Sequence, residues 1–194
     1  MKRFFCYVAT VLTMIVSLSN CASMNSGWTT LIDGSSLDNW TAIGNANWRV
    51  AEGTVMADKG EGFLLTKNSY GDFQIRAEFW VDDKANSGIF IRCTDATKVN
   101  SKNSYEVNIF DQRPDTSYGT GAIVDVAKIP NNPYKAGGKW NTYEITAKGD
   151  SFTVTLNGVR TVDGARDPRH ANGLVALQYA AGVVKFRKFE IRAI

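Results

Sequence analysis

The sequence predicts an all-β protein built as a two-sheet antiparallel sandwich of the jelly-roll or concanavalin-like type. Short runs alternate between apolar and polar residues with a period of two, and 17 glycines with many Asn and Asp residues separate these runs. No stretch of a dozen residues keeps a helical period between helix caps. About ten or more short strands joined by frequent turns are typical of two stacked antiparallel sheets.

The clearest strand is expected at residues 73–81, where every second residue from Phe73 to Val81 is apolar. Another is expected at residues 105–110. Asn157-Gly158 supplies the two positive φ angles of a tight hairpin turn between strands at 151–156 and 159–162. Further strands are expected at residues 48–51, 54–57, 63–66, 88–93, 121–126, 140–147, 173–179 and 183–192, and helices are expected to be brief.

The N-terminus has the parts of an export signal. Lys2 and Arg3 precede an apolar run of about 15 residues, which suits a signal-peptide core and is short for a membrane span. The run ends at Leu18-Ser19-Asn20-Cys21, which resembles a bacterial lipobox, whose cysteine is lipidated. Cleavage at Ala22 or Ser23 without lipidation is the alternative.

These features divide the chain into three parts. We expect residues 1–20 to be a signal peptide, residues 21–27 a tether lipidated at Cys21, and residues 28–194 a single β-sandwich domain. The protein is therefore expected to be an exported, membrane-anchored lipoprotein on the periplasmic or cell-surface side.

Composition argues against several kinds of function. Without Lys2 and Arg3 the formal net charge falls from +3 to +1, and no nucleic-acid partner is expected. The single histidine, His170, rules out a His-rich metal site, and no nucleophile elbow, Walker loop or dinucleotide fingerprint is present. We expect no metal and no cofactor, and Cys93 is interpreted as a small buried hydrophobe. The sequence does not indicate an oligomeric state.

Polar residues in two of the expected strands form a candidate binding face. Arg92 alternates with apolar residues in one run, and Glu106 and Asn108 do so in another. A cation, a carboxylate and an amide on adjacent strands suit a sugar, whose hydroxyl groups need donors and acceptors. A solvated face with incidental charge pairs is the alternative. The loops at residues 111–121 and 128–139 are long enough to line a site.

Residues 27–194 resemble the 3-keto-disaccharide hydrolase domain. The matching segments follow the family's order along the mature chain: Leu31-Ile32-Asp33-Gly34-Ser35-Ser36-Leu37-Asp38-Asn39-Trp40, Glu52-Gly53-Thr54-Val55, Tyr70-Gly71-Asp72-Phe73, Ala85-Asn86-Ser87-Gly88-Ile89-Phe90-Ile91-Arg92, Tyr105-Glu106-Val107-Asn108-Ile109, Thr120-Gly121-Ala122-Ile123, Trp140-Asn141-Thr142-Tyr143-Glu144, Leu177-Gln178 and Phe186-Arg187.

The resemblance implies a concanavalin-like sandwich that acts on glycosides already oxidised to a ketone at C3. Such a ketone acidifies the C2 proton, so a base can remove it and the C1 oxygen can leave by elimination, with or without net hydrolysis. The resemblance implies Glu106 as the base and Arg92 as the cation that orients the ligand or stabilises the enolate. A structural ion pair between them, which would lower the pKa of Glu106, is the alternative.

The resemblance also implies a set of substrate-binding residues, which supply amide, hydroxyl, carboxylate and aromatic groups: Asn86, Ser87, Asn108, Asp111, Gln178, Tyr179 and Trp140. Two of them have other interpretations. Trp140 opens a strand and can equally be a core residue, and Asp111 can serve turn formation or a hard cation such as Ca²⁺.

The chain departs from the family pattern at three places. The family usually has Gln at Asn108, Tyr at Val124 and Asp-His-Gly at Tyr179-Ala180-Ala181. The missing His keeps a non-catalytic carbohydrate-binding lipoprotein open as the alternative function, and a structural or adhesion lipoprotein is a third. The expected partners are a carbohydrate and, through the lipid, a membrane.

Overall fold

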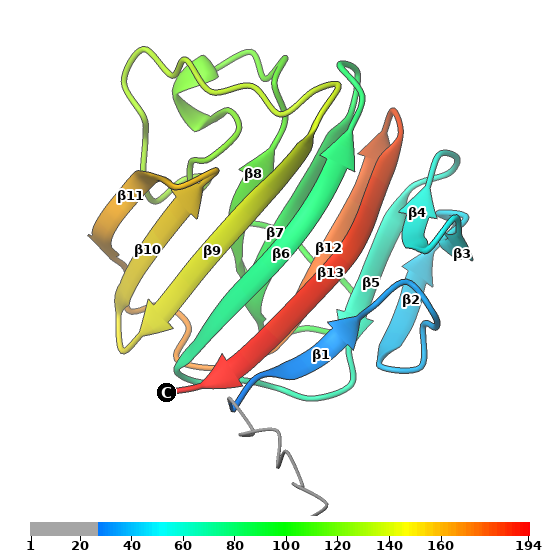
Figure 1. Ribbon diagram of the computed structural model, residues 1–194. Coiled ribbons are helices and arrows are strands. Elements are labelled where there is room, and N and C mark those ends of the chain that lie inside the picture. The colour runs from blue at the N-terminus through cyan, green and yellow to red at the C-terminus, as the bar shows by residue number, and fades with distance from the viewer. Residues whose placement is uncertain (1–26) are drawn as a thin grey trace, which may run out of the picture.

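A computed structural model describes residues 27–194, which form two antiparallel sheets packed face to face (Figure 1). The prediction of an all-β sandwich is confirmed. The strands are β1 (Thr29–Ile32), β2 (Trp40–Gly44), β3 (Arg49–Ala51), β4 (Thr54–Ala57), β5 (Gly62–Thr66), β6 (Phe73–Val81), β7 (Asn86–Cys93), β8 (Tyr105–Ile109), β9 (Trp140–Lys148), β10 (Ser151–Leu156), β11 (Val159–Arg166), β12 (Leu174–Ala181) and β13 (Val184–Ala193).

The expected signal peptide and the lipid attachment at Cys21 lie outside the described residues. Within residues 27–194 the helical structure is one short 3₁₀ turn, η1 (Thr116–Tyr118), so no helix in this range is long and apolar enough to cross a membrane.

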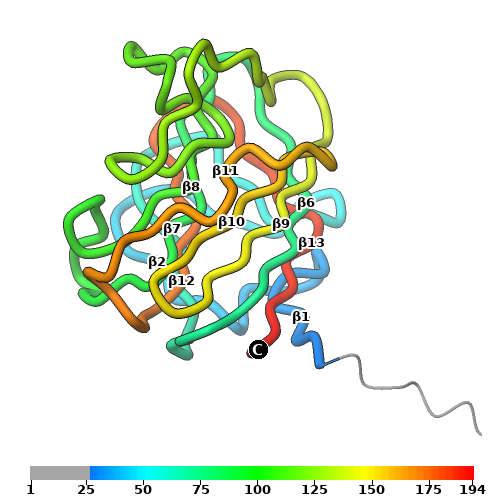
Figure 2. The backbone as a smooth tube through the Cα atoms, turned by 90° about the vertical axis from the view of Figure 1, so that its left-hand side faces the viewer, coloured from blue at the N-terminus to red at the C-terminus, as the bar shows by residue number. Residues whose placement is uncertain are grey.

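The two sheets have different sizes. The eight-stranded sheet has the order β11-β10-β9-β6-β13-β4-β3, with β1 paired to β13, and the five-stranded sheet has the order β2-β5-β12-β7-β8. The segment between β8 and β9, residues 110–139, gathers over one end of the sandwich (Figures 1 and 2). We call this segment the loop end.

The inner faces of both sheets form the core, and most strands alternate between buried and outward-facing residues. In β6 every second residue from Phe73 to Val81 is almost fully buried, as the period of two predicts. Phe79 stacks on Tyr143 of the neighbouring strand, with ring centroids 5.0 Å apart. The hairpin prediction is also confirmed, because Asn157 and Gly158 have φ angles of 50° and 80°.

The strand expected at residues 121–126 is wrong. The segment runs along the free edge of β8, where Asn108 N donates to Ala122 O (3.0 Å) and Val124 N donates to Glu106 O (3.0 Å). It does not continue as a strand, because Asp125 has a φ of +61° and Ala127 N turns back to donate to Ile123 O. The segment is a turn that closes the sheet edge.

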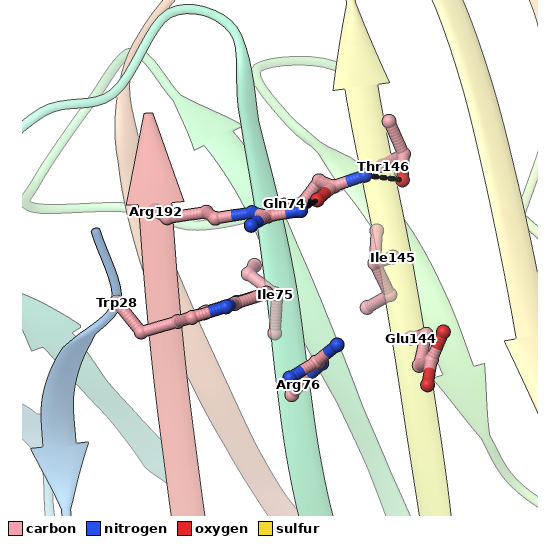
Figure 3. Close-up of a pocket in the computed structure, with 8 residues that line it drawn as sticks. All are labelled: Trp28, Gln74, Ile75, Arg76, Glu144, Ile145, Thr146 and Arg192. Atoms are coloured by element: carbon pink, nitrogen blue, oxygen red, sulfur yellow. Dashed lines mark hydrogen bonds between the residues drawn. The ribbon is translucent and has the colours of Figure 1, made fainter. Parts of the chain in front are cut away.

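Trp28 fixes the start of β1 to the outer face of the eight-stranded sheet (Figure 3). The guanidinium carbons of Arg76 and Arg192 lie 4.5 and 4.7 Å from its ring centroid. Nε of Arg192 also donates to Oε1 of Gln74 (2.8 Å), which holds that guanidinium in place. A small cavity of about 140 Å³ is left between these side chains.

Replacing Trp28 by Ala is expected to lower the free energy of unfolding by about 1–2 kcal/mol, because two cation–π contacts of about 0.5–1 kcal/mol each are lost. Trp140→Ala is the matched control, because Trp140 contacts a single guanidinium, that of Arg187 at 4.2 Å. Urea denaturation measures both variants. Equal losses of unfolding free energy in the two variants would show that the second arginine at Trp28 adds nothing to stability.

Candidate active site

The outer face of the five-stranded sheet carries the candidate site. In β8, Tyr105, Val107 and Ile109 belong to the core, so Glu106 and Asn108 point to the outer face. Pairing then aligns three strands, because Asn108 lies opposite Gly88 of β7, and Gly88 lies opposite Gln178 of β12.

Gly88 makes room for the carboxyl group of Glu106. A Cβ atom at residue 88 would lie 3.2 Å from Cγ and 3.3 Å from Oε1 of Glu106. The Glu106 side chain therefore folds over β7 at the glycine that separates Asn108 from Gln178. Only a residue without a side chain leaves this approach unstrained.

Burial changes the acidity of Glu106. The residue is 8% exposed, and removal from water raises the pKa of its carboxyl from 4.5 to about 7. The positive charge of Arg113 acts against this rise in pKa, and the negative charge of Asp125 adds to it. No side-chain hydrogen bond to this carboxyl is found within residues 27–194. A carboxyl group with a pKa near 7 can take up and release a proton at neutral pH.

Two amide groups beside Glu106 carry oxygens without partners. Nδ2 of Asn108 donates to the carbonyl of Tyr118 (2.6 Å), while its Oδ1 is buried and accepts no hydrogen bond from the residues that the structure describes. Oε1 of Gln178 is in the same state. A buried polar atom left unpaired costs about 1–3 kcal/mol. Both oxygens keep their capacity to accept a hydrogen bond, and a ligand hydroxyl group reaches them only when the groups that cover them move.

Arg113 and Asp125 are charged residues near Glu106 that the sequence reasoning missed. Arg113 is half-buried in the loop end, and its charge acts on both Glu106 and Asp115. Asp125 is exposed and accepts a hydrogen bond from Oγ of Ser101 (2.9 Å). The available signal for Arg113 was its place in the loop at residues 111–121, which was expected to line the site.

Arg92 does not lie beside Glu106. It is 1% exposed, and its guanidinium donates to the carbonyl oxygens of Gly71 (3.0 Å), Gly149 (2.6 Å) and His170 (3.1 Å) and to Oδ1 of Asp72 (3.0 Å). These partners belong to three loops, so Arg92 ties loops together. Neither the expected pairing of Arg92 with the base nor the alternative ion pair with Glu106 is formed.

A β-bulge explains this difference. β7 has one more residue than β12 between the pairs Phe90↔Ala176 and Cys93↔Leu174, and Arg92 within it has a φ of +53°. The extra residue interrupts the alternation that the sequence suggested, so Arg92 turns away from the face that carries Phe90.

Two other expected ligands, Ser87 and Tyr179, point into the protein. Ser87 is fully buried and its Oγ donates to the carbonyl of Gln178 (2.7 Å). The Tyr179 hydroxyl donates to the carbonyl of Gly182 (2.9 Å), and its ring packs edge-on against Trp48. Asn86 is half-buried and shares the outward orientation of Gly88 by alternation, so it lies on the same face as Glu106.

Asp111 and Trp140, two more of the expected ligands, also lie away from Glu106 or have a structural role. The carboxylate of Asp111 accepts hydrogen bonds from Thr120 Oγ1 (2.6 Å), Ala136 N (2.9 Å) and Gly137 N (2.9 Å), so it organises the loop end. Trp140 is 37% exposed on the outer face of the eight-stranded sheet. The structure thus brings together Glu106, Asn108, Gln178 and Asn86, and places the other expected residues elsewhere.

Cys93 is buried as expected, and this burial raises the pKa of its thiol to about 12.

Comparison with known proteins gives a family and several structural relatives. Residues 27–192 match the family described as the 3-keto-alpha-glucoside-1,2-lyase-like domain. Comparison with curated proteins gives no match. A crystal structure of a candidate glycosyl hydrolase from Parabacteroides distasonis is 26% identical, with a TM-score of 0.71, over 86% of this chain and 99% of that chain.

More distant structures share the fold. The carbohydrate-binding module CBM66 from Bacillus subtilis is 19% identical, with a TM-score of 0.56, over 86% of this chain and 96% of that chain. A protein with a galectin-like fold, also from Bacillus subtilis, is 10% identical, with a TM-score of 0.63, over 84% of this chain and 94% of that chain.

Replacing Arg92 by Met is expected to lower the free energy of unfolding by about 3–5 kcal/mol, because a buried charge network loses its centre and leaves carbonyl groups unpaired. Arg113→Met is the matched control and should change stability by less than about 0.5 kcal/mol. Chemical denaturation measures both. Unchanged stability together with lost activity in Arg92→Met would instead place Arg92 in the chemistry.

Replacing Glu106 by Gln should stabilise the protein in a pH-dependent way. The folded protein holds the Glu106 proton more tightly than the unfolded chain, so this stabilising contribution is complete below pH 4.5 and is lost as the pH rises to about 7. Gln stays neutral throughout. The variant should match the wild type at pH 4 and exceed it by about 2–3 kcal/mol at pH 8. A difference in unfolding free energy that is the same at both pH values would exclude the raised pKa.

Proposed function

The chain belongs to the 3-keto-alpha-glucoside-1,2-lyase-like domain family, and on this basis we propose that it cleaves 3-keto glycosides with Glu106 as the base. The supporting observation is the Glu106 carboxyl, with its pKa near 7, which folds over Gly88 beside the unpaired oxygens of Asn108 and Gln178. A base tuned to neutral pH next to free hydroxyl acceptors suits proton abstraction from a bound sugar.

The ionised carboxylate of Glu106 takes the proton from C2 of the sugar. The electron pair of that C–H bond moves into a C2–C3 double bond, and the C3 ketone becomes an enolate oxygen. The guanidinium of Arg113 is the positive charge that acts on Glu106, and it favours this anion, the role that the family resemblance had implied for Arg92.

The enolate then collapses. Its electrons re-form the C3 ketone, the C2–C3 pair becomes a C1–C2 double bond, and the C1–O bond breaks with its electron pair on the leaving oxygen. Protonated Glu106 or water returns a proton to that oxygen. The product is an unsaturated keto sugar, and later addition of water across the C1–C2 double bond would give net hydrolysis.

The candidate ligands have separate tasks in this scheme. Once the groups that cover them move, Oδ1 of Asn108 and Oε1 of Gln178 accept hydrogen bonds from sugar hydroxyl groups and hold C2 near Glu106. Asn86 lies further along the same face of β7 and supplies an amide at the rim of the site. Uncharged acceptors orient the sugar without adding negative charge beside the enolate.

A binding function without catalysis is the second candidate, favoured by one residue. Ala180 follows Gln178 by two residues on β12, in a bulge between Tyr179 and Ala181, and this is where the sequence lacks the family's His. If proton transfer requires an imidazole there, the site would bind a keto sugar and release it unchanged.

Glu106→Gln should reduce kcat on a 3-keto glucoside by about 10²–10⁴-fold and leave binding of the substrate within a few-fold, because only proton transfer is removed. Glu144→Gln is the matched control, because Glu144 is an exposed carboxylate on the other sheet.

Arg113→Met should move the acidic limb of the kcat/KM profile to higher pH, since the positive charge of Arg113 holds the pKa of Glu106 down.

Three outcomes of this experiment are distinct. Loss of turnover in Glu106→Gln alone supports the enzyme. Wild-type binding without any turnover supports the binding module, and Ala180→His then tests whether the missing side chain is the reason. Turnover that survives in Glu106→Gln excludes Glu106 as the base.

A further inference from the structure

Phe110 differs from the other aromatic residues of this protein in its surroundings. It is half-buried at the end of β8, where the loop end begins (Figure 1). Within residues 27–194, every other Phe, Tyr and Trp either packs in a hydrophobic cluster or lies against a Lys or Arg side chain, and Phe110 does neither. No cation of this range therefore covers the faces of the Phe110 ring.

Phe110 lies on the face that carries Glu106. Strands β7 and β8 pair without a bulge, and Ser87 lies opposite Ile109. Extending this register by one residue sets Phe110 opposite Asn86. Ile109 belongs to the core, so alternation turns Phe110 to the outer face of the five-stranded sheet. An aromatic ring and an amide thus face the same side as the candidate base.

The outer surface of β7 and β8 meets solvent at one end. All of β8 and all of β7 after Asn86 are buried, whereas Asn86 and Phe110 are half-buried. The neighbouring strand β12 adds half-buried side chains at this end, those of Gln178, Ala180 and Ala181. A ligand on this surface therefore approaches the base over Asn86 and Phe110.

This open end is one step along the sheet from the base. The Glu106 carboxyl folds over Gly88, which precedes Phe90 and follows Asn86 by two residues on β7. With about 3.4 Å per residue along a strand and about 4.8 Å between strands, the Cα atom of Gly88 lies about 7 Å from that of Asn86 and about 8 Å from that of Phe110. One ligand of two sugar rings can therefore contact Glu106 and Phe110 together.

We propose that Phe110 and Asn86 form the subsite for the leaving sugar of the substrate. This inference rests on the proposed cleavage of 3-keto glycosides. Glu106 removes the proton from C2 of the keto sugar, and the rest of the substrate is attached at the neighbouring C1. Because the surface on the other side of Glu106 is buried, that part of the substrate lies over the open end. The apolar face of its pyranose ring stacks on Phe110, and its hydroxyl groups bind the amide of Asn86.

The test compares a 3-keto disaccharide that has a glucose leaving group with the methyl 3-keto glucoside, which lacks that ring. Phe110→Leu keeps an apolar side chain but removes the flat ring. It should raise KM for the disaccharide about 10-fold and change KM for the methyl glucoside less than about 3-fold, because only the leaving sugar loses a contact. Phe110→Tyr restores a flat ring and should return KM for the disaccharide to within about 2-fold of the wild type.

Two further variants complete this comparison. Asn86→Ala should also raise KM for the disaccharide selectively, and it replaces Phe110→Leu as the test if that variant does not fold. Trp140→Ala alters an exposed aromatic residue on the other sheet and is the control, with KM unchanged for both substrates.

Binding to the inactive variant Glu106→Gln separates this subsite from the proposed reaction. In calorimetric titrations, adding Phe110→Leu to Glu106→Gln should raise Kd for the disaccharide about 10-fold and Kd for the methyl glucoside less than about 3-fold. If the wild type cleaves neither sugar and this difference in Kd remains, the proposed reaction fails and the subsite stands. Equal effects of Phe110→Leu on both sugars, no effect on either, or no binding of the disaccharide would overturn the subsite.

Discussion

The organisation of β7 is the constraint on which the rest of the structure depends. Gly88 leaves space for the Glu106 side chain, Phe90 beside Glu106 is buried in a second hydrophobic cluster, and the bulge that follows turns Arg92 toward the protein. There the Arg92 guanidinium binds the carbonyl oxygens of three loops and closes that end of the sandwich. One strand therefore supports both the candidate site and the packing beneath it, because the bulge divides its side chains between two faces.

The candidate site carries costs that packing alone would avoid. In the part of the chain that the structure describes, the carboxyl of buried Glu106 has no hydrogen-bonded partner, and the amide oxygens of Asn108 and Gln178 are unpaired. Each feature destabilises the folded protein by itself. The buried cation Arg92 is instead fully satisfied, as expected of a structural group. Costs that gather at one spot on an outer face are characteristic of a binding or catalytic site.

The two outer faces of the sandwich differ in how their aromatic residues are used. On the eight-stranded sheet, Trp28 and Trp140 are covered by guanidinium groups, so their ring faces are already occupied. On the five-stranded sheet, Phe63 borders a cavity that Ile43 and Val99 also line. Aromatic residues alone were therefore a poor guide to the sugar site, and the distinction lies in what already covers each ring.

The sequence by itself determined the sandwich, the alternation of β6, the Asn157-Gly158 turn and the outward orientation of Glu106 and Asn108, because these follow from a period of two and from local φ preferences. Only the tertiary structure decided the rest. A bulge shifts the alternation by one residue and leaves no signal in the sequence. The bulge in β7 therefore turned Arg92 away from the face where the sequence placed it. Arg113 approaches Glu106 from a loop whose path is set by Asp111 and its backbone partners. Such contacts join residues distant in sequence, and no local pattern encodes them.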